Sequence, residues 1–321
     1  MGARAAAVLA LALACTGSPA PPPPPEVRLL VSADLPGAAA RELAARAGIA
    51  RVTLVADPGA AEVVWVSDPV AALVLGERLA AGAIPEPAGV TPRWLDRRGR
   101  FAPLGARAAT LLVSERAEAA LPFAVDSLRY LVDPRLHGRV ALVHPGRGSG
   151  PALYAALALA YGEPAALRYL RGLAASGPRV LGSEGEVRAA VASGGASVGL
   201  VGSLVAAPAA AGFGGLRLRY PDQTGAGTPT LPTAVAVLQG GGDGARRLAA
   251  WLVGPEAERL LVARAPGLLP LRTDVPVPAG VELAENLTAP ALDWDRLAAE
   301  AAALAPVLAR WPEAPAAPGA R

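Results

Sequence analysis

Short apolar runs alternate with stretches of helical periodicity along almost the whole chain, and this alternation most restricts the folds open to it. Glu26–Ser32 has strand character, and Gly37–Ala47 follows it with charged residues spaced for a solvent-facing side of a helix. The order returns in mid-chain, where an apolar run ending at Val143 precedes a helical run over Pro151–Tyr161. Such alternation predicts parallel α/β layers. Further strands are expected at 51–56, 62–66, 180–181 and 196–200, and helices at 70–81, 184–193, 245–263 and 293–310.

The composition limits the classes of protein that the chain can belong to. Its 321 residues suffice for two lobes of roughly 100–150 residues each. Hydrophobic residues make up 53%, but 36 Gly and 33 Pro divide them into short segments, which predicts a globular protein without a membrane span. The net charge is only +3, all of the basic side chains are Arg, and aromatic residues make up 4%. A nucleic-acid partner is therefore not expected.

The N-terminal region predicts export followed by a stiff spacer. Arg4 gives the N-terminal region a positive charge, and the apolar run that follows it ends at Ala14. This run is too short to span a bilayer, and the combination is typical of a signal peptide. The next residue, Cys15, is the only cysteine, and the run before it resembles a bacterial lipobox, so Cys15 is the predicted lipidation site. Ordinary cleavage after Ala14 or Ala20 is the alternative. No disulfide can form within the chain, and five consecutive prolines predict a polyproline spacer.

A glycine-rich turn, Pro145–Gly150, stands between a predicted strand and a predicted helix. Free backbone N–H groups and the helix dipole make such a turn an anion site, although a plain tight turn has the same pattern. Ser149 could also donate through its hydroxyl, beside Gly148. His144 precedes the turn, where a neutral imidazole could bind a metal, donate to an anion or serve the structure alone.

Several segments, taken together, resemble bacterial extracellular solute-binding proteins of the ferric-iron ABC transporter type, which have the type 2 periplasmic-binding fold. The resemblance extends from about Leu29 to Arg310 and rests on the order and spacing of pieces that are weak alone. These pieces are VVWVSDP at 63–69, GARA at 105–108, DPRLHGRV at 133–140, GEVR at 185–188, YPDQ at 220–223, LLPLR at 268–272 and DWD at 293–295.

The resemblance implies two α/β lobes joined by two crossover hinge strands, near Arg107–Ser114 and Thr230–Leu238. Closure of the lobes would bury a small ligand between them. The implied division is a signal peptide and proline-rich lipoprotein spacer over 1–25, the first part of lobe 1 over 26–105, a crossover strand and lobe 2 over 106–234, a return to lobe 1 with C-terminal helices over 235–311, and a flexible tail over 312–321.

The resemblance also implies where a ligand would bind. It aligns Arg107 with an arginine that grips a carboxylate or a synergistic anion, Ser149 with a ligand-side hydroxyl, and Tyr220 with a tyrosine that faces the cleft. A solvated arginine and a packing tyrosine are the structural alternatives. Ser32 and Asp68 stand near positions where the family offers metal-binding oxygens.

Direct binding of iron(III) is not expected. Ferric-binding members hold the metal with a pair of adjacent tyrosines, and Leu204-Val205 stands in their place. Hard trivalent iron needs several charged oxygen ligands, which this chain hardly provides. A small anion or a preformed metal chelate suits Arg107, Ser149 and Tyr220 better.

The predicted function is that of the solute receptor of an ABC importer, with no cofactor. Its partners would be a small ligand, a transporter permease and, through the lipid, a membrane facing the periplasm, and it would act as a monomer. No nucleophile elbow and no metal-ligand spacing supports an enzyme. The alternative is a binding-fold lipoprotein that has lost transport and acts as a sensor or interaction module.

Overall fold

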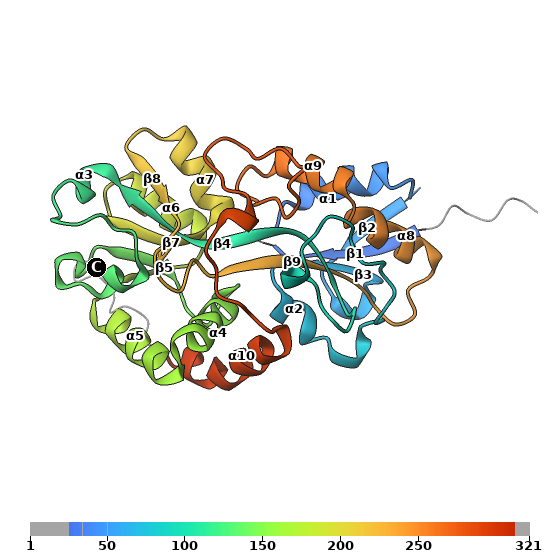
Figure 1. The fold of residues 1–321 in the computed structure, drawn as a ribbon, viewed down its shortest axis with the longest axis horizontal. Helices are drawn as coiled ribbons and strands as arrows, with labels where there is room; N and C mark the ends of the chain where they lie inside the picture. The colour runs from blue at the N-terminus through green and yellow to red at the C-terminus, as the bar shows by residue number, and fades with distance from the viewer. Residues whose placement is uncertain (1–25, 34, 50, 312–321) are drawn as a thin grey trace, which may run out of the picture.

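The computed structural model describes residues 26–33, 35–49 and 51–311. The predicted signal peptide, Cys15, the spacer and the tail lie outside these residues. Within them, nine strands form one sheet in the order β2-β1-β3-β9-β4-β7-β5-β6, with β8 also paired to β4 (Figure 1). The strands are β1 Glu26–Val31, β2 Arg51–Val55, β3 Val63–Val66, β4 Ala102–Ser114, β5 Val140–Val143, β6 Arg179–Leu181, β7 Val198–Gly202, β8 Leu216–Arg219 and β9 Thr230–Val237.

Two long strands cross the middle of the molecule and belong to both halves of the sheet. β4 and β9 are antiparallel to each other; β9 pairs with β3 on one side, and β4 pairs with β7 and β8 on the other. β1, β2 and β3 are parallel in lobe 1, and β5, β6 and β7 are parallel in lobe 2. This arrangement confirms the predicted α/β fold with two lobes and two crossover strands. The predicted lobe boundaries near residues 105 and 234 fall inside these strands and stay predictions.

Helices cover both faces of the sheet, which explains why its central strands are apolar on both sides. All eight residues of β9 are buried. In β3, Val63 and Trp65 enter one apolar cluster while Val64 enters another, as the two-residue period of a strand requires. One face carries α1 (Gly37–Arg46), α8 (Asp243–Leu252) and α9 (Pro255–Arg264) in lobe 1, and α6 (Glu184–Ala192) and α7 (Ser203–Gly212) in lobe 2. The other carries α2 (Pro69–Leu73), α4 (Gly150–Tyr161), α5 (Glu163–Ala175) and α10 (Trp294–Ala309) (Figure 1). The short α3 (Glu115–Glu118) follows β4.

Two helix predictions were wrong because glycine and proline interrupt the helices. The helix expected over 70–81 stops with α2 at Leu73, and Gly76 then takes φ +56°, which a right-handed helix cannot include. The helix expected over 245–263 is two helices, α8 and α9. Pro255 opens the second one, and the residue before it, Gly254, adopts an extended conformation, as the residue before a proline prefers.

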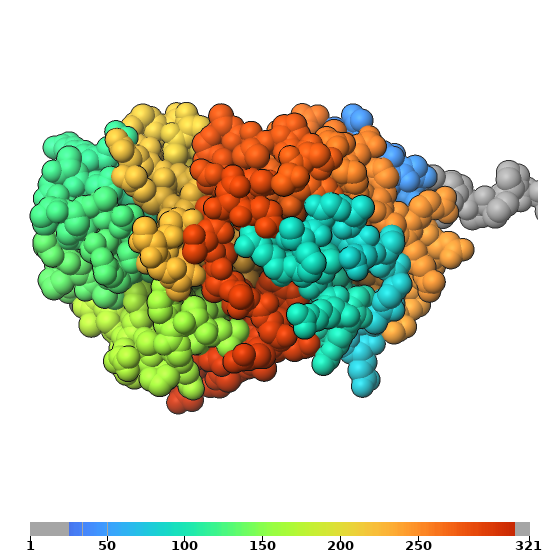
Figure 2. Space-filling model, viewed as in Figure 1, coloured from blue at the N-terminus to red at the C-terminus, as the bar shows by residue number. Residues whose placement is uncertain are grey.

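The last helix, α10, bridges the two lobes. It packs against α4 of lobe 2 and against α2 of lobe 1. In Figure 2 the red C-terminal segment runs along the junction between the green-to-yellow half and the blue-to-orange half. α10 therefore adds a third link between the lobes to the two crossover strands. No described helix has the length and apolar character needed to cross a bilayer.

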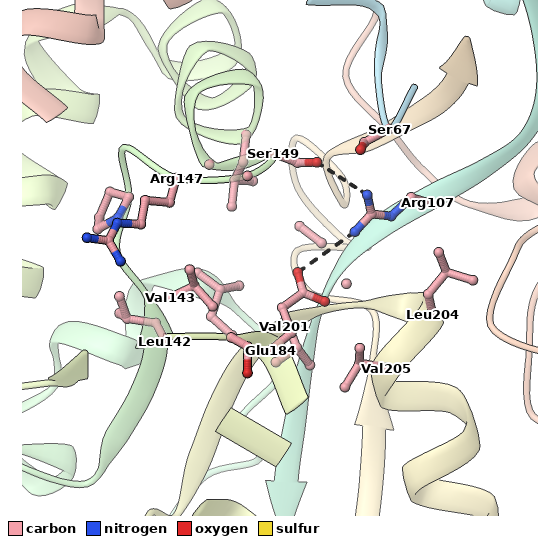
Figure 3. A pocket seen from close by; sticks show the side chains of 18 of the residues that line it. Ser67, Arg107, Leu142, Val143, Arg147, Ser149, Glu184, Val201, Leu204 and Val205 are labelled. Atoms are coloured by element: carbon pink, nitrogen blue, oxygen red, sulfur yellow. Dashed lines mark hydrogen bonds and ion pairs between the residues drawn. The ribbon is translucent and has the colours of Figure 1, made fainter. Parts of the chain in front are cut away.

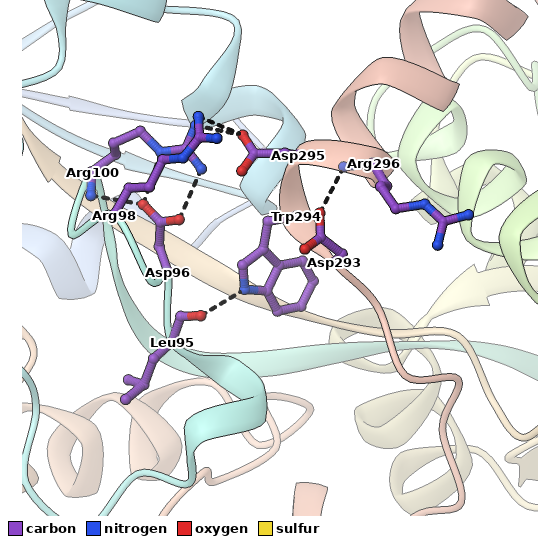
Figure 4. A network of polar contacts seen from close by, with 8 residues as sticks. All are labelled: Leu95, Asp96, Arg98, Arg100, Asp293, Trp294, Asp295 and Arg296. Carbon is purple, nitrogen blue, oxygen red and sulfur yellow. Dashed lines mark hydrogen bonds and ion pairs between the residues drawn. The ribbon is translucent and has the colours of Figure 1, made fainter.

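The start of α10 is tied to lobe 1 by a polar network (Figure 4). Asp293 caps the helix by accepting the Arg296 N–H, and the Trp294 indole N–H donates to the carbonyl of Leu95 at 3.0 Å. Arg100 donates 2.9 and 2.8 Å hydrogen bonds to the Asp96 carboxylate and a 2.7 Å bond to Asp295.

Asp96, from the loop before β4, is the buried carboxylate of this network. Burial alone would raise the pKa of Asp96. The hydrogen bonds that Arg100 donates from its guanidinium and its backbone outweigh that effect, so the pKa lies below its ordinary value.

Candidate functional site

A cavity of about 500 Å³ lies between the lobes beside the crossover strand β4 (Figure 3). Lobe 2 supplies most of its wall, because β5, β6 and β7 are parallel and their carboxyl ends meet at one edge of the sheet. Residues 143–145, 147–150, 182–185, 200–202, 204 and 205, which follow or end these strands, line the cavity. The helices that begin there, α4, α6 and α7, direct their N-termini toward the same space.

The glycine-rich turn before α4 forms one side of this cavity. Gly148 adopts φ +55°, a conformation that favours glycine, and a Cβ at Gly150 would lie 2.2 Å from the carbonyl oxygen of Pro145. The turn therefore requires glycine at both places. Among the described residues, no acceptor receives the backbone N–H groups of Gly148 and Ser149. These donors can serve a ligand.

Arg107 lies in the middle of β4 and reaches across to lobe 2. Its side chain is 8% exposed. Nη1 donates to the Ser149 hydroxyl at 3.3 Å, and Nη2 lies 3.9 Å from Oε1 of Glu184 (Figure 3). A Cβ at Gly202 would lie 3.1 Å from Nη2, so the glycine at the end of β7 leaves room for the guanidinium. The structure thus brings Arg107, Ser149 and Gly148, three of the predicted ligand-binding residues, together at one cavity. Their role in ligand binding stays a prediction.

The lobe 1 side of the cavity consists of the carboxyl ends of β1 and β3. Ala33, Ser67 and Asp68 line it. Asp68 is 4% exposed and caps α2, accepting the Ala71 N–H at 2.9 Å. Ser32 is not among the lining residues; its backbone N–H donates to the carbonyl of Trp65.

Glu184 is a cavity residue that the sequence analysis did not predict. It is the first residue of α6, after the N-cap Ser183, and its side chain is 31% exposed. Within the described chain its carboxylate accepts no hydrogen bond, and it forms an ion pair with Arg107 at 3.9 Å. The predicted parallel strands could have pointed to Glu184, because parallel β5 and β6 place the residues that follow both strands at the same edge of the sheet.

The remaining wall is largely apolar. Leu204 and Val205, at the start of α7, are half-buried and line the cavity together with Leu142, Val143, Leu153 and Val201. Figure 3 places Leu204 and Val205 on the same side as Arg107 and Glu184. The residues that stand in place of the expected tyrosine pair thus present hydrocarbon to the cavity. Among the described residues, no three His, Cys, Asp or Glu side chains are grouped so that they could hold a metal ion.

His144 lines the cavity and connects it to the end of α10. The Gly146 N–H donates to Nδ1 at 3.1 Å, so Nδ1 is an acceptor and the ring proton is on Nε2. Nε2 donates to the carbonyl of Trp311 at 3.1 Å, and the two rings meet edge to face. Trp311 in turn donates its indole N–H to the carbonyl of Leu170 in α5. His144 therefore ties the glycine-rich turn, through Nδ1, to the segment that follows α10, through Nε2.

Tyr220 lies elsewhere, so the prediction that it joins Arg107 and Ser149 is corrected. It follows β8 and lines a different pocket, on lobe 2, together with Tyr161 and Tyr169. Its hydroxyl accepts the Glu282 N–H at 3.3 Å, and burial raises its pKa to about 12. β8 pairs with β4 but not with β5, β6 or β7, the strands whose carboxyl ends form the lobe 2 wall of the cavity.

Two α/β lobes, two crossover strands and a cavity where strand ends meet define a bilobal binding protein of the type 2 periplasmic class. The sequence matches the family model of the bacterial extracellular solute-binding proteins over residues 84–300, more than half of the chain. The chain belongs to this family, and the predicted resemblance is confirmed. Membership of an extracellular family implies that the chain is exported. A comparison with curated proteins gave no match.

Solved structures agree with this fold. The chain is similar to apo ferric ion-binding protein A of Pasteurella haemolytica, with 17% identity and a TM-score of 0.72 over 91% of this chain and 99% of that one. Iron-bound HitA of Pseudomonas aeruginosa gives 21% identity and 0.72 over 89% and 99%. AfuA of Actinobacillus pleuropneumoniae, with fructose-6-phosphate bound, gives 16% and 0.74 over 89% and 98%. At these identities the likeness shows the fold alone.

Proposed function

We propose that this protein is the solute receptor of an ABC importer and that its ligand presents an anionic group to Arg107. A small anion and a preformed metal chelate both have such a group. The protein binds and releases its ligand without chemistry of its own, and it docks as a monomer on a transporter permease. Family membership supports the receptor role, and the cavity between the lobes supports a ligand of small size.

The position of Arg107 carries the proposal for the anionic group. A guanidinium can donate two parallel hydrogen bonds to a carboxylate or phosphate. Arg107 lies on the strand shared by both lobes and already contacts Ser149, beside two backbone N–H groups that have no described acceptor. A group held there touches the shared strand and lobe 2 at once, which is how a ligand favours the closed state.

Calorimetric titration tests this proposal. The protein is purified from its own host, native mass spectrometry identifies the ligand that stays bound, and that ligand is titrated into the stripped protein. A charge-assisted contact contributes roughly 1.5–3 kcal/mol. Arg107→Ala should therefore weaken binding about ten- to a hundredfold. Arg107→Lys should recover only part of this loss, because a lysine ammonium cannot donate two parallel hydrogen bonds to one anionic group.

Arg171→Ala is the matched control, because Arg171 is exposed on α5 and does not line the cavity. It should leave the affinity unchanged. An Arg107→Ala protein that melts like the wild type and binds equally well would remove Arg107 from the site. A permease gene beside the gene of this protein favours the importer; without one, a sensor or interaction module that has lost transport becomes the better assignment.

We also propose that the mature protein is anchored through lipid on Cys15, as the signal run that ends there and the proline spacer suggest. Bacterial lipoproteins carry several acyl chains, and one chain alone would bind only marginally. Cys15→Ser should move the protein from the membrane fraction to the soluble fraction. Membrane association of this variant that survives a salt wash would refute the anchor.

A further inference from the structure

We infer that the ligand is a small zwitterion with an apolar side chain, the chemistry of an apolar amino acid or a short apolar peptide. This inference rests on the proposed receptor function and specifies its ligand. The carboxylate would bind at Arg107 and Ser149, the ammonium at Glu184, and the side chain against the apolar wall that begins with Leu204 and Val205.

The charges of the cavity argue against a ligand that carries only negative charge. Four charged side chains of the described residues line it: Arg107 and Arg147 are positive, and Asp68 and Glu184 are negative. Arg147 is exposed and lies across the view from Arg107 in Figure 3. A simple anion at Arg107 would therefore add negative charge next to Glu184, in a site where like charges are poorly screened. A zwitterion adds no net charge.

The spacing of the two groups suits adjacent charges on one ligand. Nη2 of Arg107 and Oε1 of Glu184 are 3.9 Å apart, which is longer than a hydrogen bond. The guanidinium and the carboxylate thus face the same part of the cavity without closing on each other (Figure 3). An α-amino acid carries its carboxylate and its ammonium on neighbouring atoms, so it can reach both partners together.

The apolar wall gives the third contact. Leu204 and Val205 are half-buried at the cavity, and Val143 and Val201 also line it. Hydrocarbon lining favours a ligand group that leaves water on binding, at about 0.8 kcal/mol for each buried CH₂. Binding pockets for small ligands measure roughly 300–1,000 Å³, and the cavity of about 500 Å³ falls within this range.

The first experiment compares ligands that differ by one group. Stripped wild-type protein is titrated calorimetrically with leucine, valine, phenylalanine, alanine and the dipeptide Leu-Leu. Two truncated probes complete the panel: 4-methylpentanoate is leucine without its ammonium, and 3-methylbutylamine is leucine without its carboxylate. Phosphate and citrate serve as plain anions. Leucine should bind at least tenfold tighter than either truncated probe and roughly fiftyfold tighter than alanine, from three additional buried carbons.

The second experiment uses variants of the proposed ammonium site and of the wall. Glu184→Gln should weaken leucine binding about ten- to a hundredfold, yet leave 4-methylpentanoate unchanged or bound more tightly. Leu204→Asn should reduce the preference for leucine over alanine. Glu163→Gln is the matched control, because Glu163 opens α5 as Glu184 opens α6, but it is exposed and does not line the cavity.

The outcomes separate this inference from the receptor function. If 4-methylpentanoate, phosphate or citrate binds at least as tightly as leucine, or if Glu184→Gln leaves leucine binding unchanged or tightens it, Glu184 does not hold a ligand ammonium; the inference is then overturned and the receptor proposal stands. If the amino acids, Leu-Leu and the anions all fail to bind to folded protein, and native mass spectrometry finds no ligand, the zwitterion inference and the receptor proposal are both overturned. Leucine binding that Glu184→Gln weakens and Glu163→Gln does not supports the inference.

Discussion

Replacing His144 by phenylalanine should loosen the glycine-rich turn without disturbing the packing around it. Phenylalanine keeps a flat ring for the edge-to-face contact with Trp311, but it can neither accept the Gly146 N–H nor donate to the Trp311 carbonyl. The variant therefore isolates the two hydrogen bonds that tie the turn to the end of α10.

The magnitude follows from these two bonds, both 3.1 Å long. Each contributes about 0.5–1.5 kcal/mol net, so the free energy of unfolding should fall by about 1–3 kcal/mol. Gly146 is exposed, and water can replace its lost acceptor, which favours the lower half of that range. The turn would be affected more than the fold as a whole, because its remaining backbone bonds are few.

Urea unfolding and native-state hydrogen exchange measure the two effects separately. The midpoint should shift at an unchanged m-value, and the Gly146 amide should exchange faster than in the wild type. His137→Phe is the control, because His137 is the other histidine of the chain and is exposed. Unchanged exchange at Gly146 in His144→Phe would show that the histidine does not hold the turn.

Three further perturbations test other parts of the structure. Arg272→Met should cost about 3–5 kcal/mol in urea unfolding, because it leaves the fully buried Glu258 carboxylate without its 2.5 Å partner; a loss below about 1 kcal/mol would contradict this. Gly267→Ala should lower the melting temperature and reduce the free energy of unfolding by about 1–3 kcal/mol, because the added Cβ would lie 2.2 Å from the Ser203 carbonyl oxygen. An unchanged melting curve would refute the contact. The pKa of Asp96 is lowered in the folded protein, so its stabilising contribution is complete above the ordinary value near pH 4 and disappears as the pH falls through the folded pKa. The stability difference between wild type and Asp96→Asn should accordingly shrink in acid, and a difference that grows there would reverse the sign of the argument.

The fold was largely predictable because strands, helices and breakers leave local signals. The alternation of apolar runs and helical stretches predicted the α/β layers, and the extended runs near residues 107–114 and 230–238 correspond to β4 and β9. The errors came from single residues. Gly76 and Pro255 each stop a helix whose apolar periodicity continues past them, and the periodicity was given more weight than the breaker.

The candidate site was predictable only in part, because it depends on which strand ends meet in space. Ser149 and Arg107 were found through a turn motif and a resemblance, and the structure brings them within 3.3 Å. Tyr220 had a similar resemblance but follows β8, which pairs with β4 outside the main strand order, and it lines the other pocket. Glu184 looked like an ordinary charge in the first turn of a helix. Only the order of β5, β6 and β7 shows that it faces Arg107.

The hydrogen bonds of His144 connect the glycine-rich turn at the cavity to the end of α10. We therefore expect ligand binding in the cavity to be detectable at the outer surface of the protein. Arg310 is exposed at the C-cap of α10, next to Trp311, whose carbonyl His144 holds. A change in the glycine-rich turn would therefore reach the surroundings of residue 310 through one side chain. An environment-sensitive fluorophore attached to Arg310→Cys, in a Cys15→Ser background, would convert this protein into an optical sensor whose label stays clear of the ligand.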